Sequence, residues 1–187
     1  MFSVKNRRLT RLKGCDYSQG GWYFVTFCVK NCEYLLGDIA NEEIRLSEIG
    51  RMAQKCWLEI PDHFPCVILD EFIVMPNHIH GIIVVGDNAL QNKDFCSAIV
   101  GNNNYCSLPQ QPWQKQWARS LSSIVRGFKI GVTKWCRQNN NQHFVWQKSF
   151  YDHIIRHEKS LFKIRNYIVS NPSKWEVDRN NRENLLM

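Results

Sequence analysis

The sequence has no apolar run approaching the roughly 18–20 residues that a membrane span requires. Its first residues, Met1 to Lys5, also lack the apolar core of a secretory signal peptide. Eight cysteines are present, but they are scattered and no C-x-x-C pair occurs, so a zinc knuckle is not expected. We therefore expect no membrane segment, a cytoplasmic location, and cysteine thiols that are reduced and mostly buried.

What the sequence does contain is enough apolar material for one core, together with an excess of positive charge. Hydrophobic residues make up 44% of the 187 residues and aromatic residues 12%, which argues against disorder. The length fits a single domain over residues 1–187. The net charge of +7 favours an anionic partner such as nucleic acid. Residues 1–14 contain several cations and no acid, and we expect them to form a basic arm.

Apolar patterning predicts strands and helices in the order β-α-β-β-α-β-α. Aromatic and β-branched residues dominate the segments expected to form strands, which are 22–29, 66–74, 79–85 and a short strand from 144. Apolar residues recur at helical spacing in the segments expected to form helices, which are 47–60, 118–138 and 158–170. Residues 86–115 are polar and irregular, which is typical of a functional or disordered loop. This order indicates an α+β domain with a small antiparallel sheet and helices packed on one face.

The segment Met75-Pro76-Asn77-His78-Ile79-His80-Gly81 gives the sharpest chemical signal. Residues i and i+2 of a strand share a face, so His78 and His80 point together while Ile79 points into the core. Two imidazoles at this spacing can bind one metal ion. Gly81 would leave room for a ligand to approach the backbone. Taken alone, the pair fits two surface histidines on a half-exposed strand better than it fits a metal site.

A second signal comes from Tyr167 and Asn171 near the end of the last expected helix. Positions i and i+4 of a helix are neighbours, so the phenol and the carboxamide face the same way, with Lys163 one turn earlier. Taken alone, the tyrosine fits ordinary packing beside a core stripe, and an asparagine before Pro172 fits a helix cap.

Together these segments resemble the single-tyrosine HUH nucleases, specifically the REP-associated tyrosine transposases. Five segments in the same order carry the resemblance, namely 21–26, 75–81, 120–129, 145–156 and 167–175. The resemblance implies a ferredoxin-like antiparallel sheet, with the catalytic tyrosine on the C-terminal helix. It implies Tyr167 as the nucleophile, and His78, His80 and Asn171 as the metal ligands. Tyr151, which precedes Asp152 and His153, is the other candidate nucleophile, and the amide four residues after Tyr167 favours Tyr167.

The function that the resemblance implies is metal-dependent cleavage and rejoining of single-stranded DNA near hairpins, through a 5′-phosphotyrosine intermediate. The implied cofactor is Mg²⁺ or Mn²⁺, with the two histidines favouring Mn²⁺, and no organic cofactor is expected. The implied partner is single-stranded or hairpin DNA. The REP-associated branch is expected to act as a monomer rather than a homodimer, in the cytoplasm and associated with the nucleoid.

Phosphate contacts are expected from the basic arm, from the basic face of the 118–138 helix and from the last helix. The candidates are Lys5, Arg7, Arg8, Arg11, Arg119, Arg126, Lys129 and Lys163. Tryptophans that could stack on unpaired bases are Trp22, Trp113, Trp117 and Trp146. Two alternatives remain: a domesticated module that binds hairpins without cutting them, and a metal-dependent hydrolase that uses water. The second alternative lacks further carboxylate ligands in the sequence pattern and leaves Tyr167 without a role.

Overall fold

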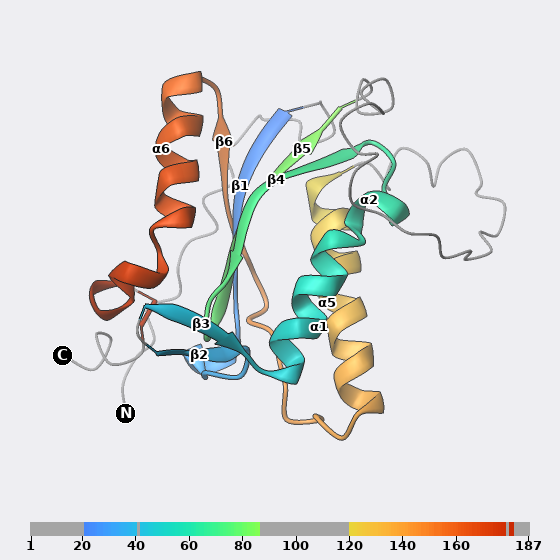
Figure 1. Cartoon of the computed structure of the whole chain (residues 1–187). Helices are drawn as coiled ribbons and strands as arrows, with labels where there is room; N and C mark the ends of the chain where they lie inside the picture. The colour runs from blue at the N-terminus through green and yellow to red at the C-terminus, as the bar shows by residue number, and fades with distance from the viewer. Residues whose placement is uncertain (1–20, 41, 87–119, 179, 182–187) are drawn as a thin grey trace, which may run out of the picture.

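The computed structural model describes residues 21–40, 42–86, 120–178 and 180–181. A four-stranded antiparallel sheet in the order β4-β5-β1-β6 forms the centre of the fold (Figure 1). Its strands are β1 (Gly21–Cys28), β4 (Val67–Val74), β5 (His78–Val85) and β6 (Tyr151–Ile155). With β1 and β5 central and a helix between β1 and β4 and between β5 and β6, this is the ferredoxin-like arrangement. The expected α+β class is confirmed.

Two helices, α1 (Glu48–Leu58) and α5 (Leu121–Gln138), cover one face of the sheet (Figure 1). Each begins at a serine whose hydroxyl accepts a hydrogen bond from the backbone N–H three residues later, at Ser47 and Ser120. Alternate residues of β1 and β5 meet the apolar stripes of both helices in the main core. Its fully or nearly fully buried members include Val25, Phe27, Trp57, Ile79, Ile83 and Phe128.

The opposite face of the sheet is covered by α6 (Glu158–Val169), which lies across the sheet from α1 and α5 (Figure 1). Ile168 of α6 packs there with Phe24, Ile82 and Ile155 in a second apolar cluster. The expectation that helices pack on one face therefore holds for α1 and α5 but is wrong for α6. The physical reason is that β1 and β5 also bear apolar residues on their second face, and the apolar stripe of α6 is buried against them.

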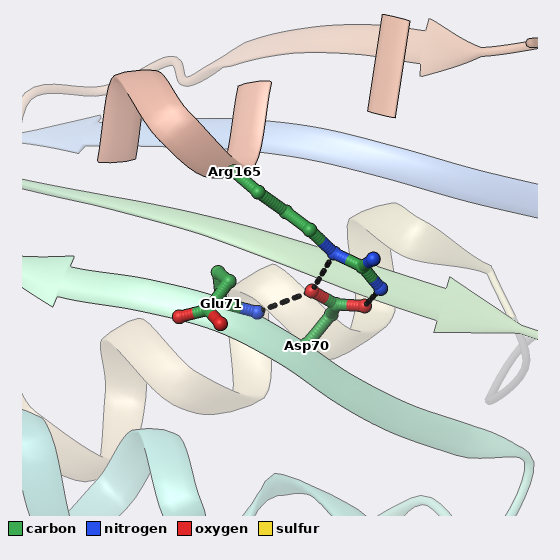
Figure 2. A network of polar contacts seen from close by, with 3 residues as sticks. All are labelled: Asp70, Glu71 and Arg165. Atoms are coloured by element: carbon green, nitrogen blue, oxygen red, sulfur yellow. Dashed lines mark hydrogen bonds and ion pairs between the residues drawn. The ribbon is translucent and has the colours of Figure 1, made fainter. Parts of the chain in front are cut away.

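An ion pair ties α6 to the edge strand β4 (Figure 2). Asp70 and Glu71 lie in an irregularity of β4, between the paired residues Leu69 and Phe72. Arg165 donates from Nε to one oxygen of Asp70 at 2.8 Å and from Nη2 to the other oxygen. Burial raises the pKa of Asp70, but Arg165 and the backbone N–H of Glu71 outweigh it and hold that pKa below its usual value. The ion pair therefore links the helix that carries Tyr167 to an edge of the sheet.

Several short elements were not expected from the sequence. They are η1 (Lys30–Cys32), the hairpin of β2 (Gly37–Ala40) and β3 (Glu43–Leu46), α2 (Ile60–His63), and η3 (Pro172–Val177). The basic arm and, apart from Gly86, the 86–115 loop lie outside the described residues. Within the described part of the chain, no helix has the length and apolar character needed to cross a membrane.

The strand expected from Phe144 is wrong, because the strand in this region begins at Tyr151. Trp146 makes only an isolated bridge with Val29. Lys129 Nζ donates to the carbonyl oxygens of Gln147 at 2.9 Å and Ser149 at 3.1 Å. Two backbone acceptors of this segment are thus bonded to a lysine of α5 rather than to a neighbouring strand.

Candidate active site

The two histidines of β5 lie side by side on the face of the sheet that α6 covers. His78 and His80 are completely buried, and their Nε2 atoms are 3.0 Å apart. Their neighbour Ile79 lies in the main core on the other face. The alternation of a strand therefore separates the histidine pair from the apolar core by one residue step. Because both histidines are buried, the interpretation of the pair as two surface histidines is excluded.

Asn77 and Thr26 hold the two imidazole rings. The Asn77 amide nitrogen donates to the carbonyls of Cys32 at 3.2 Å and Asn180 at 2.7 Å, so its oxygen faces His78 Nδ1 at 2.8 Å. His78 Nδ1 must then carry the hydrogen, which leaves a lone pair on Nε2, the form that binds a metal. Thr26 Oγ1 lies 2.8 Å from His80 Nδ1 and can accept or donate, so His80 can also present a lone pair. Sequence reasoning missed both supporting residues.

α6 brings Tyr167 to the histidine pair. Its phenol oxygen lies 3.2 Å from His80 Nε2, and its ring packs edge-on against Phe24. Asn171 follows α6 with helical backbone angles, so it stays close to Tyr167 along the chain. Asn171 is buried to 1% exposure, and its Oδ1 has no hydrogen-bond partner. A buried acceptor without a partner lowers stability unless a ligand satisfies it.

Asp178 is a site residue that the sequence did not reveal. Its Oδ2 lies 3.4 Å from both the Tyr167 hydroxyl and the Asn171 amide nitrogen, each of which donates to it. Its Oδ1 accepts from the Asn180 backbone N–H at 2.6 Å. The donor atoms of Asp178, His78 and His80 all lie within 4.8 Å of one another. Asp178 reaches this position because η3 follows α6 closely, and no residue spacing in the sequence signals that turn.

These donors fit a divalent metal ion. Two ligands about 2.1 Å from one ion and at a right angle to each other lie about 3.0 Å apart, which matches the two imidazole nitrogens. The unsatisfied oxygen of Asn171 and the carboxylate of Asp178 add oxygen donors beside them. Imidazole nitrogens suit Zn²⁺, Cu²⁺ and Fe²⁺, whereas carboxylate and carbonyl oxygens suit Mg²⁺ and Mn²⁺, so the mixed set fits a divalent ion without selecting one.

The C-terminal segment covers the histidines on one side and leaves an opening beside the tyrosine. Trp175 of η3 stacks on His78 with ring centroids 6.0 Å apart. Tyr34 packs against Trp175 and donates to Asn181 at 2.6 Å, which fastens the segment to the rest of the fold. A pocket of about 460 Å³ opens next to this cover and is lined by Tyr167, Asn171, Lys174, Val177 and Asp178. A phosphate group entering it would meet the phenol.

The other residues predicted to take part lie elsewhere. Lys163 is exposed on α6, and Arg126 is exposed on α5, across the sheet from the histidines. Lys129 is bonded to backbone carbonyls and lies near the rings of Phe27 and Trp146, and burial lowers its pKa to about 8. The remaining predicted contacts, Lys5, Arg7, Arg8, Arg11 and Arg119, and the tryptophans Trp113 and Trp117, lie outside the described residues.

Three further expectations concern aromatic residues and Gly81. Trp146 is buried and Trp22 is partly buried, with Arg165 over its ring, so neither is a fully exposed stacking platform. Gly81 does not face a ligand, because a Cβ placed on it would lie 2.3 Å from the ring of Trp57 in the main core. Tyr151 pairs with Thr26 on the edge strand and is 38% exposed.

Known proteins resemble this chain over most of its length. An uncharacterized protein of Haemophilus influenzae is 43% identical over 94% of this chain and 93% of its own length. A second protein of that organism, provisionally named a REP-associated tyrosine transposase, is 26% identical over 85% of this chain and 74% of its own length. The solved structure of a REP-associated tyrosine transposase bound to a REP hairpin shares the fold, with a TM-score of 0.54 and 21% identity over 84% of this chain and 69% of that one. No protein-family model matches the chain.

Proposed function

We propose that the chain is a REP-associated tyrosine transposase, like the proteins it resembles, and that it cleaves and rejoins single-stranded DNA beside hairpins through a covalent bond to Tyr167. The observation that carries the proposal is the phenol of Tyr167, which lies 3.2 Å from Nε2 of His80 in a buried histidine pair whose rings are held by Asn77 and Thr26. The hairpin bound by the related transposase supports the same class of substrate here.

In the proposed reaction the Tyr167 oxygen attacks the scissile phosphorus, and the bond from phosphorus to the 3′ oxygen breaks. The products are a 5′-phosphotyrosine and a free 3′-hydroxyl, and the 3′ oxygen takes up a proton. Because the phosphodiester energy is kept in the covalent bond, a 3′-hydroxyl can reverse the step and rejoin strands. A free phenol has a pKa of about 10 and is a weak nucleophile near neutral pH, so its hydrogen needs an acceptor.

Two groups of this chain contact the phenol hydrogen, namely His80 Nε2 and Asp178 Oδ2. We assign His78, His80 and Asn171 as metal ligands, with Asp178 beside them as a further oxygen donor. A bound divalent ion would polarise the scissile phosphate and neutralise charge on its oxygens. If His80 uses its Nε2 lone pair as a ligand, the Asp178 carboxylate still accepts a hydrogen bond from the phenol and helps to hold it in place.

Activity as a monomer is part of the proposal. His78, His80, Tyr167, Asn171 and Asp178 all belong to one chain and are in contact or within a few ångströms of one another. A site assembled within one chain needs no second copy to supply its tyrosine. Sedimentation of active, DNA-bound protein at the mass of one chain would support this, and activity found only in a dimer fraction would oppose it.

A second candidate function is favoured by one observation. Metal-dependent hydrolases use carboxylate ligands, and Asp178 supplies the carboxylate that the sequence pattern lacked. In that case water rather than Tyr167 would attack phosphorus, and no covalent intermediate would form. The two candidates therefore differ in one measurable species, the protein–DNA adduct.

The test uses a hairpin oligonucleotide with unpaired flanks, labelled at its 3′ end, because a 5′-phosphotyrosine keeps the 3′ fragment on the protein. The full-length protein is incubated with it and Mn²⁺, and adducts are separated on a denaturing gel. Tyr167→Phe should form no adduct yet bind the hairpin as wild type does. Tyr151→Phe is the matched control, since it removes a phenol from the same face of the sheet, and it should form the adduct.

Each other outcome assigns a different function. An adduct with Tyr167→Phe would rule out this nucleophile, and loss of the adduct in Tyr151→Phe alone would assign Tyr151. Cleavage without any adduct would establish the hydrolase. Hairpin binding without cleavage in the wild type would establish the domesticated binding module.

A further inference from the structure

A large groove lies on the other side of the sheet from the histidines. It has a volume of about 960 Å³ and runs between one face of α5 and the segment 142–150 that leads into β6. Five cations line it, namely Arg126, Lys129, Lys134, Arg137 and Lys148, and no acidic residue occurs among the described residues that line it. Charge of a single sign along a groove attracts an extended anion.

Four of these cations are exposed, namely Arg126, Lys134, Arg137 and Lys148. Among the described residues, none of the four forms an ion pair or a side-chain hydrogen bond. Lys129 differs, since it holds segment 142–150 onto α5 through two backbone carbonyls. Lys129 thus holds the two walls of the groove together, and the four exposed cations, called the rim cations, face solvent.

The positions of the rim cations fit a phosphate backbone. Arg126 and Arg137 are separated by about 16 Å along α5, from a rise of about 1.5 Å per residue. One strand of duplex DNA places a phosphate about every 3.4 Å along the axis, so the row spans several phosphates. Lys148 stands on the opposite wall of the groove.

The aromatic residues of the groove are placed for packing rather than for stacking on bases. Phe144 and Trp146 are 3% and 8% exposed and belong to the main core. Binding of unpaired bases uses exposed aromatic faces, whereas a duplex keeps its bases paired and presents phosphates. The groove therefore matches a duplex stem better than a single strand.

One wall of the groove is continuous along the chain with an edge strand that lies near the candidate active site. Segment 142–150 continues into β6, an edge strand of the sheet, whose first residue Tyr151 pairs with Thr26. Thr26 in turn pairs with His80 and contacts its ring. A nucleic acid seated in the groove would need only to pass around this sheet edge to reach the face that bears Tyr167.

We infer that this α5 groove binds the double-stranded stem of the hairpin through its phosphates, while an unpaired flank passes around β6 to Tyr167. The inference rests on the proposed function for its substrate. It divides the molecule into a stem-binding surface on one side of the sheet and a strand-cleaving surface on the other.

The test measures binding and cleavage separately with the double variant Arg126→Gln/Arg137→Gln. Binding is followed by fluorescence anisotropy over a range of salt concentrations, with a hairpin and with an unpaired oligonucleotide of the same length, in the Tyr167→Phe background so that nothing is cut. The control Arg45→Gln/Lys55→Gln removes the same charge from exposed positions of β3 and α1.

The groove variant should bind the hairpin at least about 10-fold more weakly at 0.1 M salt, and the slope of log K against log salt should fall by about 2, at roughly 0.9 per phosphate contact. Its affinity for the unpaired oligonucleotide and the control's affinity for the hairpin should change less than about 2-fold. Equal losses for both DNAs would overturn the duplex assignment, and no loss with the hairpin would overturn the groove as a DNA surface.

Failure of this inference is distinguishable from failure of the proposed function. With Tyr167 restored, the groove variant should need more DNA than the wild type to form the same amount of adduct if both are right. If stem binding depended on the groove but no variant formed an adduct, the inference would be retained and the cleavage proposal rejected. If the groove variant formed an adduct and bound the stem as tightly as before, the cleavage proposal would be retained and the inference rejected.

Discussion

The two faces of the central sheet differ in composition although alternate residues of the same strands build them. On the α1 and α5 side, Val25, Phe27 and Ile79 join one continuous apolar core. On the α6 side, Thr26, His78 and His80 place buried polar groups next to a small apolar cluster. One face has the composition of a stabilising core and the other that of a chemical site.

Because of this difference, substitutions of neighbouring residues of β5 should have separable effects on stability and on metal binding. Removing apolar volume on the α5 side costs transfer and cavity energy. Removing a polar group on the α6 side takes away a ligand and leaves its partner unsatisfied. Substitutions at adjacent positions of β5 should therefore change stability on the α5 side and metal binding on the α6 side.

The largest expected effect is a metal-dependent gain in stability that belongs to the α6 face alone. At Mn²⁺ concentrations 100 times the dissociation constant, the free energy of unfolding of the wild type should rise by about 2.7 kcal/mol. His80→Gln should lose most of this gain. Urea unfolding with Mn²⁺ and with a chelator measures it.

The control for this prediction is Ile79→Val, one residue away on the other face. It should lower stability by about 0.5–1.5 kcal/mol and keep the full Mn²⁺ gain. If Ile79→Val lost the gain as well, the two faces would be coupled and the comparison would fail.

Asp178→Asn should weaken Mn²⁺ binding about 10–100-fold, by analogy with the loss of groups that tune metal sites.

The next effect concerns Gly81, which faces Trp57 in the main core on the α1 and α5 side. A methyl group there would meet the Trp57 ring at 2.3 Å, so Gly81→Ala should destabilise the fold by about 1–3 kcal/mol through overpacking. The double variant Gly81→Ala/Trp57→Leu should regain part of the loss because the clash is removed. Loss of stability equal to the sum of both single variants would show that the clash is not the cause.

The parts of the site that the sequence predicted depend on local spacing. His78 and His80 share a face because strands alternate, and Tyr167 and Asn171 are neighbours because helices repeat. Asp178 and Asn77 could not be found this way. Asp178 depends on the turn of η3, and Asn77 depends on carbonyls of Cys32 and Asn180 that are distant in the sequence. Contacts between distant segments leave no periodic signal.

The fold shows the same division between local and distant causes. The β-α-β-β-α-β order and the apolar stripe of α6 could be read from residue patterns. The side of the sheet that α6 covers could not, because it depends on which strand residues remain uncovered once α1 and α5 have packed. The segment after Phe144 has the composition of a strand, but two of its backbone acceptors, at Gln147 and Ser149, are bonded to Lys129 of α5.

A smaller effect is expected on the α5 side from Lys129→Met. The variant removes two hydrogen bonds to backbone carbonyls that water can partly replace, so it should cost about 1 kcal/mol near pH 7. Burial lowers the pKa of Lys129 to about 8, against an ordinary value of about 10.4 in the unfolded chain. Between these values the unfolded chain binds more protons, so the contribution of Lys129 to stability rises as pH rises.

The advantage of wild type over Lys129→Met in urea unfolding should therefore grow between about pH 8 and pH 10. Lys134→Met is the matched control for the loss of a lysine from the same groove, because that side chain is exposed. A flat difference for Lys129→Met would show that its ammonium group is not disfavoured by burial.

The smallest expected effect comes from the ion pair that ties α6 to β4. Arg165 is 41% exposed and Asp70 is 12% exposed, so solvent screens the pair and Asp70→Asn should cost at most about 1 kcal/mol. The pKa of Asp70 is held below its ordinary value, so this contribution is fully present above about pH 4 and is lost as pH falls through the lowered pKa. The difference in unfolding free energy between wild type and Asp70→Asn should shrink in acid and in 0.5 M salt, whereas that of Ile79→Val should respond to neither. If Asp70→Asn formed much less adduct while its free energy of unfolding fell only slightly, the ion pair would be needed to position Tyr167. If the amount of adduct and the free energy of unfolding both fell only slightly, the packing of Ile168 alone would hold the tyrosine in place.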